Sequence, residues 1–487
     1  MKFTPTTAYA RPALTGRTRL ITLGLIVAVV ISSFLGRYDA EIVGFRVRVE
    51  QVVPLLLAAW MLVHPVLRGA FLRAARHPVP LVYAAFVVWN VVTTLVFSPS
   101  LSWSASILIW LVIDLLLLVS LMALSEGADL AGRLGRWSVA PWALVGFAAF
   151  VVANLTRGQI ALGTDFDWLY EVYVSRLTAI EANIYASILV FWTLLTITRR
   201  GIGRWETAAI AVAVPLGLVA SQTRTAVFSL MLGLGVFGLF TLLSSRSSWR
   251  TRLLRILPTA VLAATLVVTY GIIAAVGDAT PADRTLPPSA SPATSAAAPA
   301  ETTTPTEPVD SITPSAPAPE ATRIPDPTNP EQQNKIGDVD FQGGTIGFRL
   351  EVARLAAQEM HGVNLWFGNG TNTFGLRHEQ PGTPGISGHI IMLPVQVLYD
   401  GGIVGLGLLV ALFVTVFVCV PRERKPVAAG LLASYLLSAT LTSMFWFAIT
   451  WILIAVILRP LGDDERNDSR DSGRGDAREP GRVFGRA

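Results

Sequence analysis

The sequence has little charge for its length. Only 15% of its 487 residues are Asp, Glu, Lys or Arg, against about 25% in an ordinary soluble domain. A larger globular core does not explain this deficit, because the apolar residues come in long uninterrupted runs. Each run approaches the roughly 20 residues that cross a ~30 Å hydrocarbon layer as a helix. Backbone polar groups in lipid must bond internally, so these runs favour membrane-spanning helices.

Cysteine is almost absent as well. The single Cys419 lies in an apolar run, which excludes an internal disulfide. No small-residue cleavage site follows the first apolar run, 20–36, since Arg37 and Tyr38 come next. We therefore expect this run to be retained as the first span rather than removed as a signal peptide.

The apolar runs predict an all-α, polytopic transmembrane bundle of about 12 spans. They lie near 20–36, 52–67, 79–97, 104–124, 138–155, 184–198, 205–220, 226–243, 256–277, 390–420, 427–445 and 446–458. The run 390–420 is too long for one straight crossing. Its Gly401-Gly402 pair predicts a short leading helix, a break, and then the span itself.

The positions of Lys and Arg predict the orientation, because cytoplasmic loops are enriched in both. With the N-terminus inside, 26 of the 38 Lys and Arg residues lie on the inner side. We expect a bacterial cytoplasmic-membrane protein with both termini cytoplasmic and a large extracytoplasmic loop before the tenth span. The net charge of +5 is spread over loops and tails, so no nucleic-acid partner is indicated.

This topology divides the chain into five predicted parts. They are spans one to nine (1–277), a disordered extracytoplasmic tether (278–340), an extracytoplasmic lid (341–389), spans ten to twelve (390–460) and a disordered cytoplasmic tail (461–487). The tether prediction depends on residues 279–330, which hold 13 of the 30 prolines among Ala, Ser and Thr. The same composition also fits an O-glycosylated stalk.

One charged residue lies in the middle of a span. Asp114 is central in WLVIDLLLLV, where a charge costs about 2.5–3.5 kcal/mol on insertion scales. It is either a structural carboxyl bonded to a neighbouring helix or part of a proton or ion pathway. A pathway normally needs several such groups, and no Lys or Arg lies mid-span to pair with Asp114.

Other polar residues gather at the predicted outer membrane boundary. They are Arg176, Glu181 and Asn183 before the sixth span, Arg224 between spans seven and eight, Arg349 opening the lid helix, His389 before the tenth span, and Asp400 before its break. The planar guanidinium group of arginine suits phosphate, and histidine suits proton transfer near neutral pH. In a plainer interpretation, the arginines extend to the interface and the histidine caps or packs against a helix.

In these segments the sequence resembles the O-antigen ligase and O-antigen polymerase superfamily, from about residue 140 to 460. The resemblance lies in four segments in order: RLTAIEANIYA, SQTRTAVFSLMLGLG, GFRLEVARLAAQEMHGVNLWFGNGTNTFG and GHIIMLPVQVLYDGGIVGLGL. The sequence departs from the family at three positions: Ile390 stands where Asn is frequent, Asp400 where Glu is frequent, and Ala182 where Pro is common. These departures bear on the subfamily more than on the type of reaction.

The resemblance implies glycosyl transfer, without a metal or cofactor, from a polyprenyl-diphosphate-linked glycan to a cell-envelope acceptor. In that reading Arg224 and Arg349 hold the diphosphate and His389 is the base. Arg176, Glu181, Asn183 and Asp400 complete the substrate-binding set. A ligase and an O-antigen-type polymerase both fit these motifs. A membrane transporter or lipid-glycan flippase, and a non-catalytic envelope scaffold, remain alternatives from other classes.

Overall fold

The computed structural model describes residues 16–42, 45–167, 172–199, 202–243, 248–279, 335–336, 339–340, 344–378 and 390–459. Most of the predicted tether, the predicted tail and His389 lie outside these ranges. The helices are α1 (Gly16–Ser32), α2 (Val49–Val63), α3 (Pro65–Ala75), α4 (Pro78–Phe97), α5 (Leu101–Met122), α6 (Ser125–Leu155), α7 (Ala182–Ile197), α8 (Arg204–Ser221), α9 (Arg224–Leu243), α10 (Trp249–Ala279), α12 (Gly344–Glu359), α13 (Val363–Phe367), α14 (Phe374–His378), α15 (Leu393–Cys419), η2 (Arg422–Arg424), α16 (Lys425–Leu441) and α17 (Ala448–Leu458).

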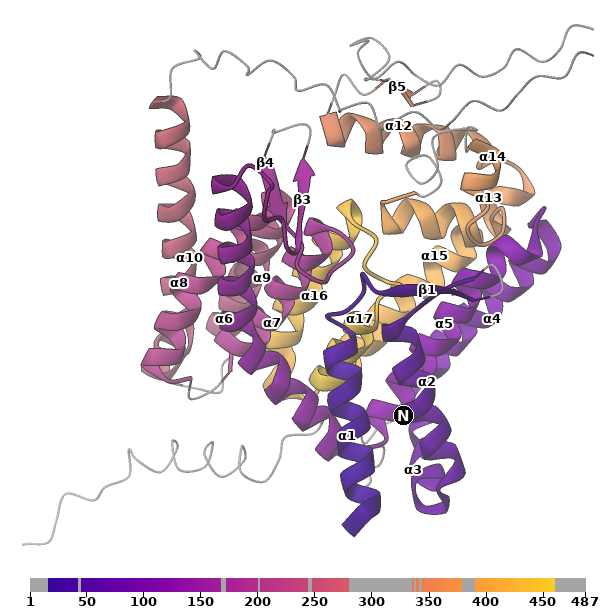
Figure 1. The fold of residues 1–487 in the computed structure, drawn as a ribbon. Helices are drawn as coiled ribbons and strands as arrows, with labels where there is room; N and C mark the ends of the chain where they lie inside the picture. Colours follow the sequence, from indigo (N-terminus) through magenta and orange to yellow (C-terminus); the bar gives the residue numbers. More distant parts are fainter. Residues whose placement is uncertain are drawn as a thin grey trace, which may run out of the picture.

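Strands are confined to three short antiparallel hairpins. They are β1–β2 (Asp39–Ile42 and Phe45–Arg48), β3–β4 (Thr164–Asp167 and Val172–Ser175) and β5–β6 (Lys335–Ile336 and Val339–Asp340). The fold is therefore an all-α bundle in which the hairpins are only connections (Figure 1).

Six of the described helices are long and apolar enough to cross a membrane: α4, α5, α6, α9, α10 and α15. The pair α2 and α3 makes a seventh if it counts as one span, although the two helices meet at 112°. The bend falls at His64, whose successor Pro65 disfavours a helical conformation at the residue before it. The all-α fold is thus confirmed and the apolar helices support a membrane protein, but the predicted count of about 12 spans and the place of the large loop are not confirmed.

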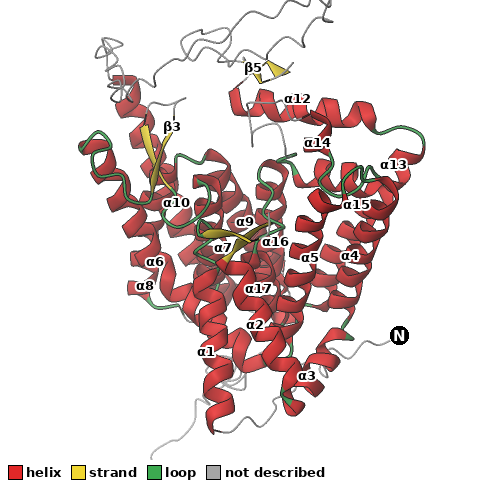
Figure 2. Ribbon diagram, turned by 45° about the vertical axis from the view of Figure 1, so that its right-hand side comes forward, coloured by secondary structure: helices red, strands yellow, loops and turns green. Residues whose placement is uncertain are grey.

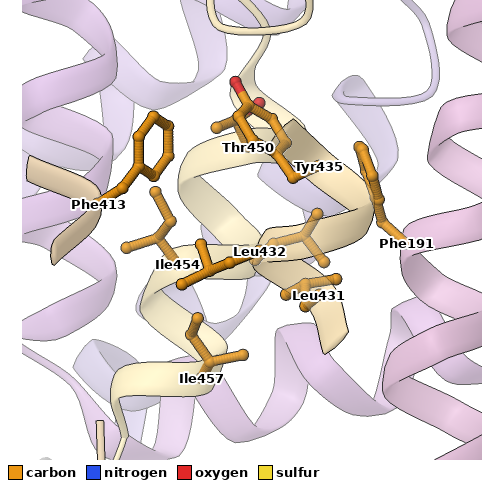
Figure 3. A pocket seen from close by; sticks show the side chains of 9 residues that line it. Phe191, Phe413, Leu431, Leu432, Tyr435, Thr450, Ile454 and Ile457 are labelled. Carbon is orange, nitrogen blue, oxygen red and sulfur yellow. The ribbon is translucent and has the colours of Figure 1, made fainter. Parts of the chain in front are cut away.

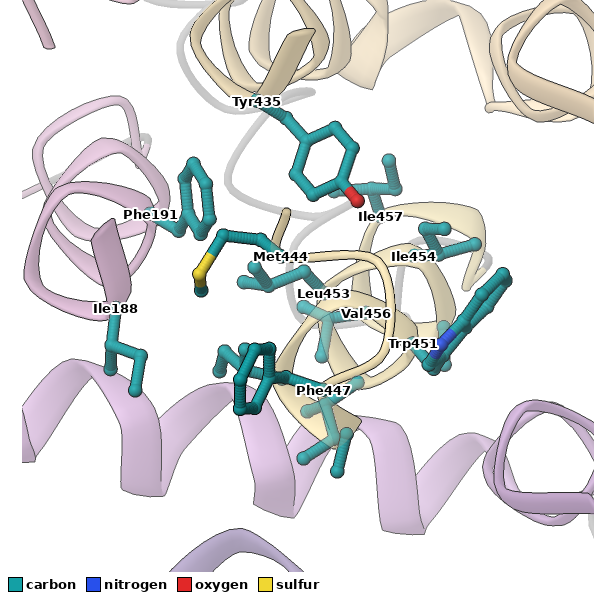
Figure 4. Packing of buried hydrophobic residues seen from close by; sticks show 14 of the residues in the cluster. Ile188, Phe191, Tyr435, Met444, Phe447, Trp451, Leu453, Ile454, Val456 and Ile457 are labelled. Carbon is teal, nitrogen blue, oxygen red and sulfur yellow. The ribbon is translucent and has the colours of Figure 1, made fainter. Parts of the chain in front are cut away.

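The shortest of the apolar helices, α17, lies at the centre of the bundle. All 11 of its residues are buried, and at 1.5 Å per residue it is only about 16 Å long. Figure 3 shows an apolar pocket beside it, formed with α7, α15 and α16. This pocket is lined by Phe191, Phe413, Leu431, Leu432, Tyr435, Thr450, Leu453, Ile454 and Ile457. In Figure 4, Ile188 and Phe191 of α7 lie beside the α17 segment. Here α17 is a core element, not an independent span.

The helix α12 lies across one end of the bundle, above α15, with α13 and α14 beside it (Figures 1 and 2). We call α12, α13 and α14 the lid, and this end of the molecule the lid end. The hairpin β3–β4 also lies at the lid end. The predicted lid helix led by Arg349 therefore exists and covers the helix ends.

The lid is joined to the bundle by a buried turn, residues 368–373, which we call the plug. Asn369, Thr371 and Thr373 are fully buried in it. The plug forms hydrogen bonds with two helices of the bundle. From α5, Trp103 Nε1 donates to the carbonyl oxygen of Asn372 (2.8 Å). Toward α4, Thr371 donates from its main-chain N–H to Thr94 Oγ1 (3.1 Å) and from its hydroxyl to Asn90 Oδ1 (3.1 Å). These contacts fix the lid to α4 and α5.

The helix α15 breaks where the plug reaches it. Gly402 has φ 67° and ψ −167° inside the helix, so the break predicted from the Gly401-Gly402 pair is present. A Cβ at Gly402 would lie 2.3 Å from the carbonyl carbon of Trp366, and one at Gly368 would lie 2.3 Å from the carbonyl oxygen of Asp400. Only glycine permits so close an approach of the two backbones.

Candidate functional site

Glu181 is the point at which the predicted basic residues converge. It caps the N-terminus of α7 at the lid end, and the positive charges of Arg349, Arg48 and Arg176 all act on its carboxylate. Removal from water raises the pKa of Glu181, Asp165 adds to that rise, and the three arginines oppose it. We call Glu181 with these three arginines the guanidinium cluster.

Arg349 brings the lid into this cluster. It lies on α12 and is only 8% exposed. Within the described part of the chain, its buried Nε has no hydrogen-bond partner. Burial lowers the pKa of Arg349, and the Glu181 carboxylate opposes that change. A buried guanidinium group with an unused donor is costly unless an anion satisfies it, so this residue is suited to binding one.

Arg176 is held by the short hairpin before α7. It follows β4 directly, forms an ion pair with Asp165 of β3, and donates from Nη1 to the carbonyl of Ile180 (3.1 Å). Its Nε is also buried without a partner among the described residues. Burial lowers the pKa of Arg176, and Asp165 opposes the effect. The hairpin thus fixes a second guanidinium group beside Glu181.

Arg48 belongs to the cluster but was not among the predicted site residues. It caps α2, lies 3.6 Å from the buried carboxylate of Glu50, and packs over the rings of Trp110 (4.6 Å) and Phe447 (5.5 Å). The sequence signal was present, since the segment FRVRVEQ places two arginines just before the second predicted span. Only the fold brings this turn to Glu181.

A hydrogen bond between the start of α7 and the turn before α9 brings Asn183 and Arg224 next to the guanidinium cluster. Thr223 Oγ1 donates to Asn183 Oδ1 (3.3 Å), which places the turn before α9 against the start of α7. Arg224 is the first residue of α9 and is exposed. Only Ala182 separates Asn183 from Glu181, so the structure brings Arg176, Glu181, Asn183, Arg224 and Arg349 to one region.

Asp400 is placed elsewhere. It is 2% exposed, and its Oδ1 accepts from the main-chain N–H of Asn372 in the plug (3.0 Å). Its described contacts fix the lid rather than join the guanidinium cluster. His389 lies outside the described residues. Its neighbour Ile390 is buried against the lid residues Val352 and Phe374.

Asp114 is buried in the bundle on α5. It is 4% exposed, and its Oδ2 has no hydrogen-bond partner among the described residues. The charge of Glu50, on the first turn of α2, acts on it. Across the described ranges, no group of three or more His, Cys, Asp or Glu side chains could hold a metal ion.

The apolar pockets lie away from these residues. The pocket of Figure 3 is enclosed by core side chains, and a second, more open pocket lies between α8 and α10 around Ala211 and Thr265. Neither is lined by a residue of the guanidinium cluster. The chemistry of the site is therefore that of charged groups at the lid end, able to bind an anion with several oxygens.

The comparisons with known proteins give no family for this chain. No family model matches the sequence, and no curated protein matches it either.

Proposed function

We propose that this protein is a metal-independent glycan ligase of the bacterial cytoplasmic membrane, resembling the O-antigen ligases. It transfers a glycan from a polyprenyl-diphosphate carrier to a cell-envelope acceptor. The observation that carries the proposal is the convergence of Arg349, Arg176 and Arg48 on Glu181 at one end of a membrane helix bundle. Orientation by the positive-inside rule makes this end extracytoplasmic.

The reaction suits such a cluster because a diphosphate leaving group gains charge as the sugar departs. Fixed cationic donors stabilise that developing charge more than they stabilise the ground state. Arginine binds two phosphate oxygens at once, and Arg349 and Arg176 each have an Nε free for a ligand among the described contacts. Arg224, on the adjoining turn, extends the binding surface.

The remaining predicted residues act on the acceptor or position the lid. A base must take the proton from the acceptor hydroxyl, which contributes about 10²–10⁴-fold to the rate, and we assign this role to His389. The polyprenyl chain stays in lipid beside the apolar spans, while the glycan faces the lid. Asn183 contributes a polar contact near Glu181. Asp400 acts on binding through the plug that positions the lid.

A deletion strain expressing single variants tests the proposal. Arg349→Ala and His389→Ala are expected to accumulate lipid-linked glycan and to lose the transferred glycan, at normal protein levels. The matched control is Arg354→Ala, on the same helix, because Arg354 is exposed and, among the described residues, its ion pair is with Glu351 three residues before it. Full activity in both site variants would remove the transferase function. If the accumulated species are single repeat units and chain length falls, the protein is a polymerase instead.

Transport is the second candidate, and one observation favours it. Glu50 and Asp114 are both buried carboxyl residues, and the charge of Glu50 acts on Asp114; intramembrane acids often form ion or proton pathways. A transporter predicts that Asp114→Asn abolishes function while His389→Ala does not. A ligase predicts the opposite dependence.

A further inference from the structure

A second polar cluster lies at the far end of α12 from Arg349. Its centre is the carboxylate of Glu359, the last residue of α12. Oε1 is bonded by His378 Nε2 (2.5 Å), and Oε2 accepts from the Tyr399 hydroxyl (2.6 Å) and from Arg377 Nη1 (2.9 Å). These donors come from α14 and α15, so three elements meet at one carboxylate.

The environment keeps this carboxylate ionised. Burial raises the pKa of Glu359, but the hydrogen bonds from Tyr399, His378 and Arg377 outweigh it and leave the pKa below its usual value. A carboxylate bonded to one ring nitrogen sets the tautomer of a histidine. With Nε2–H of His378 donating to Glu359, the lone pair of the ring lies on Nδ1.

The imidazole ring is also held in place and reachable. The Phe374 ring lies against it with centroids 4.3 Å apart, while the His378 side chain is 27% exposed and that of Glu359 25%. No hydrogen bond from a described residue occupies Nδ1 of His378. Here one nitrogen is bonded, one ring face is packed, and the second nitrogen is free for a substrate hydroxyl.

The position of the pair along α12 fits a displacement reaction. Glu359 follows Arg349 by ten residues, a distance of about 15 Å along the helix. In a direct displacement at a sugar carbon, the leaving group and the attacking hydroxyl lie on opposite sides, with the base beyond the hydroxyl. The helix α12 therefore carries a leaving-group contact near one end and, at the other, the carboxylate that orients His378 of α14.

We propose that His378, oriented by Glu359, takes up the proton of the acceptor hydroxyl in place of His389, the base that the family resemblance suggests. This inference rests on the proposed glycosyl transfer. The acceptor O–H bond breaks as its oxygen bonds to the sugar carbon. The bond from that carbon to the diphosphate oxygen breaks, and its electron pair leaves with the diphosphate. The proton passes to Nδ1 of His378 and then to water. Glu359 is a positioning residue, and Tyr399 and Arg377 hold its carboxylate.

Membrane vesicles from the deletion strain provide the test, because they retain the native lipid-linked glycan that accumulates there. The measured quantity is the initial rate at which polyprenyl diphosphate is released from it. His378→Ala is expected to lower this rate about 10²–10⁴-fold, and added imidazole to restore part of it. His378→Gln keeps an N–H donor for Glu359 and so preserves the lid contact, but it cannot take the proton and is expected to be equally slow. The control His361→Ala changes an exposed histidine in the turn after α12, whose described hydrogen bond is to the carbonyl of Gln358, and it keeps the full rate.

The outcomes separate this inference from the proposed function. A wild-type rate in both His378 variants, with activity lost in Arg349→Ala, overturns the acid–base role and leaves the ligase standing. A slow His378→Ala that imidazole does not rescue, together with an active His378→Gln, shows that the residue only holds the lid and also overturns the role. If His378→Ala and Arg349→Ala both keep the wild-type rate, the proposed function itself is wrong.

Discussion

Oδ1 of Asp400 accepts a hydrogen bond from the main-chain N–H of Asn372 at 3.0 Å, and this contact joins the broken helix α15 to the lid. The carbonyl oxygen of Asp400 also accepts from Gly370 N (3.1 Å), and that of Tyr399 accepts from Asn369 N (2.8 Å). The plug therefore continues the backbone hydrogen bonding that α15 loses at Gly402. The lid is built onto the bundle through this junction.

Removing the Asp400 carboxylate is expected to loosen the junction. Asp400→Ala leaves the buried N–H of Asn372 without an acceptor, and an unsatisfied buried donor costs about 1–3 kcal/mol. Asp400→Asn keeps an acceptor oxygen and should lose less. Thermal unfolding of the purified variants in detergent measures both. Asp39→Ala, at an exposed hairpin residue, is the control, and equal melting temperatures for all three would contradict this account of the plug.

Gly402→Ala tests the close approach of α15 to the lid. The substitution combines a positive φ of 67° with a Cβ 2.3 Å from the carbonyl carbon of Trp366. Strain and overpacking of this kind cost about 1–3 kcal/mol each. Limited proteolysis of the lid should become faster in this variant. Gly407→Ala lies on the same helix with open space around its Cβ and should leave the cleavage rate unchanged.

Much of this fold was predictable, because long apolar runs dictate helices whatever the tertiary context. The break at Gly401-Gly402 was predictable too, since glycine marks a backbone conformation that other residues avoid. The core role of α17 was not, because an 11-residue apolar helix has the same local pattern whether lipid or protein surrounds it.

The candidate site was likewise predicted only in part from the sequence. Residue type identified Arg176, Glu181 and Arg349 as unusual at a membrane boundary, and the structure places them together. Arg48 escaped prediction because its partner Glu181 lies more than a hundred residues away in the sequence. For Asp400 the sequence indicated a polar role without distinguishing a substrate contact from a contact to the plug.

The carboxylate of Glu359 predicts a pH-dependent contribution to stability. Because the pKa of Glu359 is lowered in the folded protein, the ionised form stabilises the fold. This stabilisation is present above the unfolded value of about 4.3 and is lost as the pH falls through the lower folded value. The melting temperature of the wild type should exceed that of Glu359→Gln at neutral pH, and the two should converge below about pH 4. A constant difference down to the lowest pH would argue against the ionised carboxylate.

Substitution of Asp114 distinguishes a ligase from a transporter. In the ligase account it is a buried structural carboxyl, so Asp114→Asn is expected to leave glycan transfer in cells near the wild-type level. The isosteric amide keeps the shape of the side chain and removes only its ability to ionise. Glycan transfer and protein abundance, measured together, decide the point. Complete loss of function at normal abundance would favour a transport pathway through Glu50 and Asp114.

Conservative substitution of Arg349 tests whether geometry matters beyond charge. Arg349→Lys keeps the positive charge but cannot bond two phosphate oxygens with one planar group. We expect glycan transfer to fall to a level between those of the wild type and Arg349→Ala. Quantifying transferred glycan in the three strains provides the comparison. Wild-type transfer from Arg349→Lys would show that a point charge is sufficient.

The guanidinium cluster is the central claim, and binding of farnesyl diphosphate to the full-length protein in lipid nanodiscs tests it most directly. Hydrogen bonds to charged groups contribute about 1.5–3 kcal/mol each, so Arg349→Ala should weaken binding by about 10-fold or more. Arg354→Ala should bind as the wild type does, and farnesol, which lacks the diphosphate, should not compete. Equal affinity in Arg349→Ala and Arg354→Ala, or effective competition by farnesol, would contradict the account.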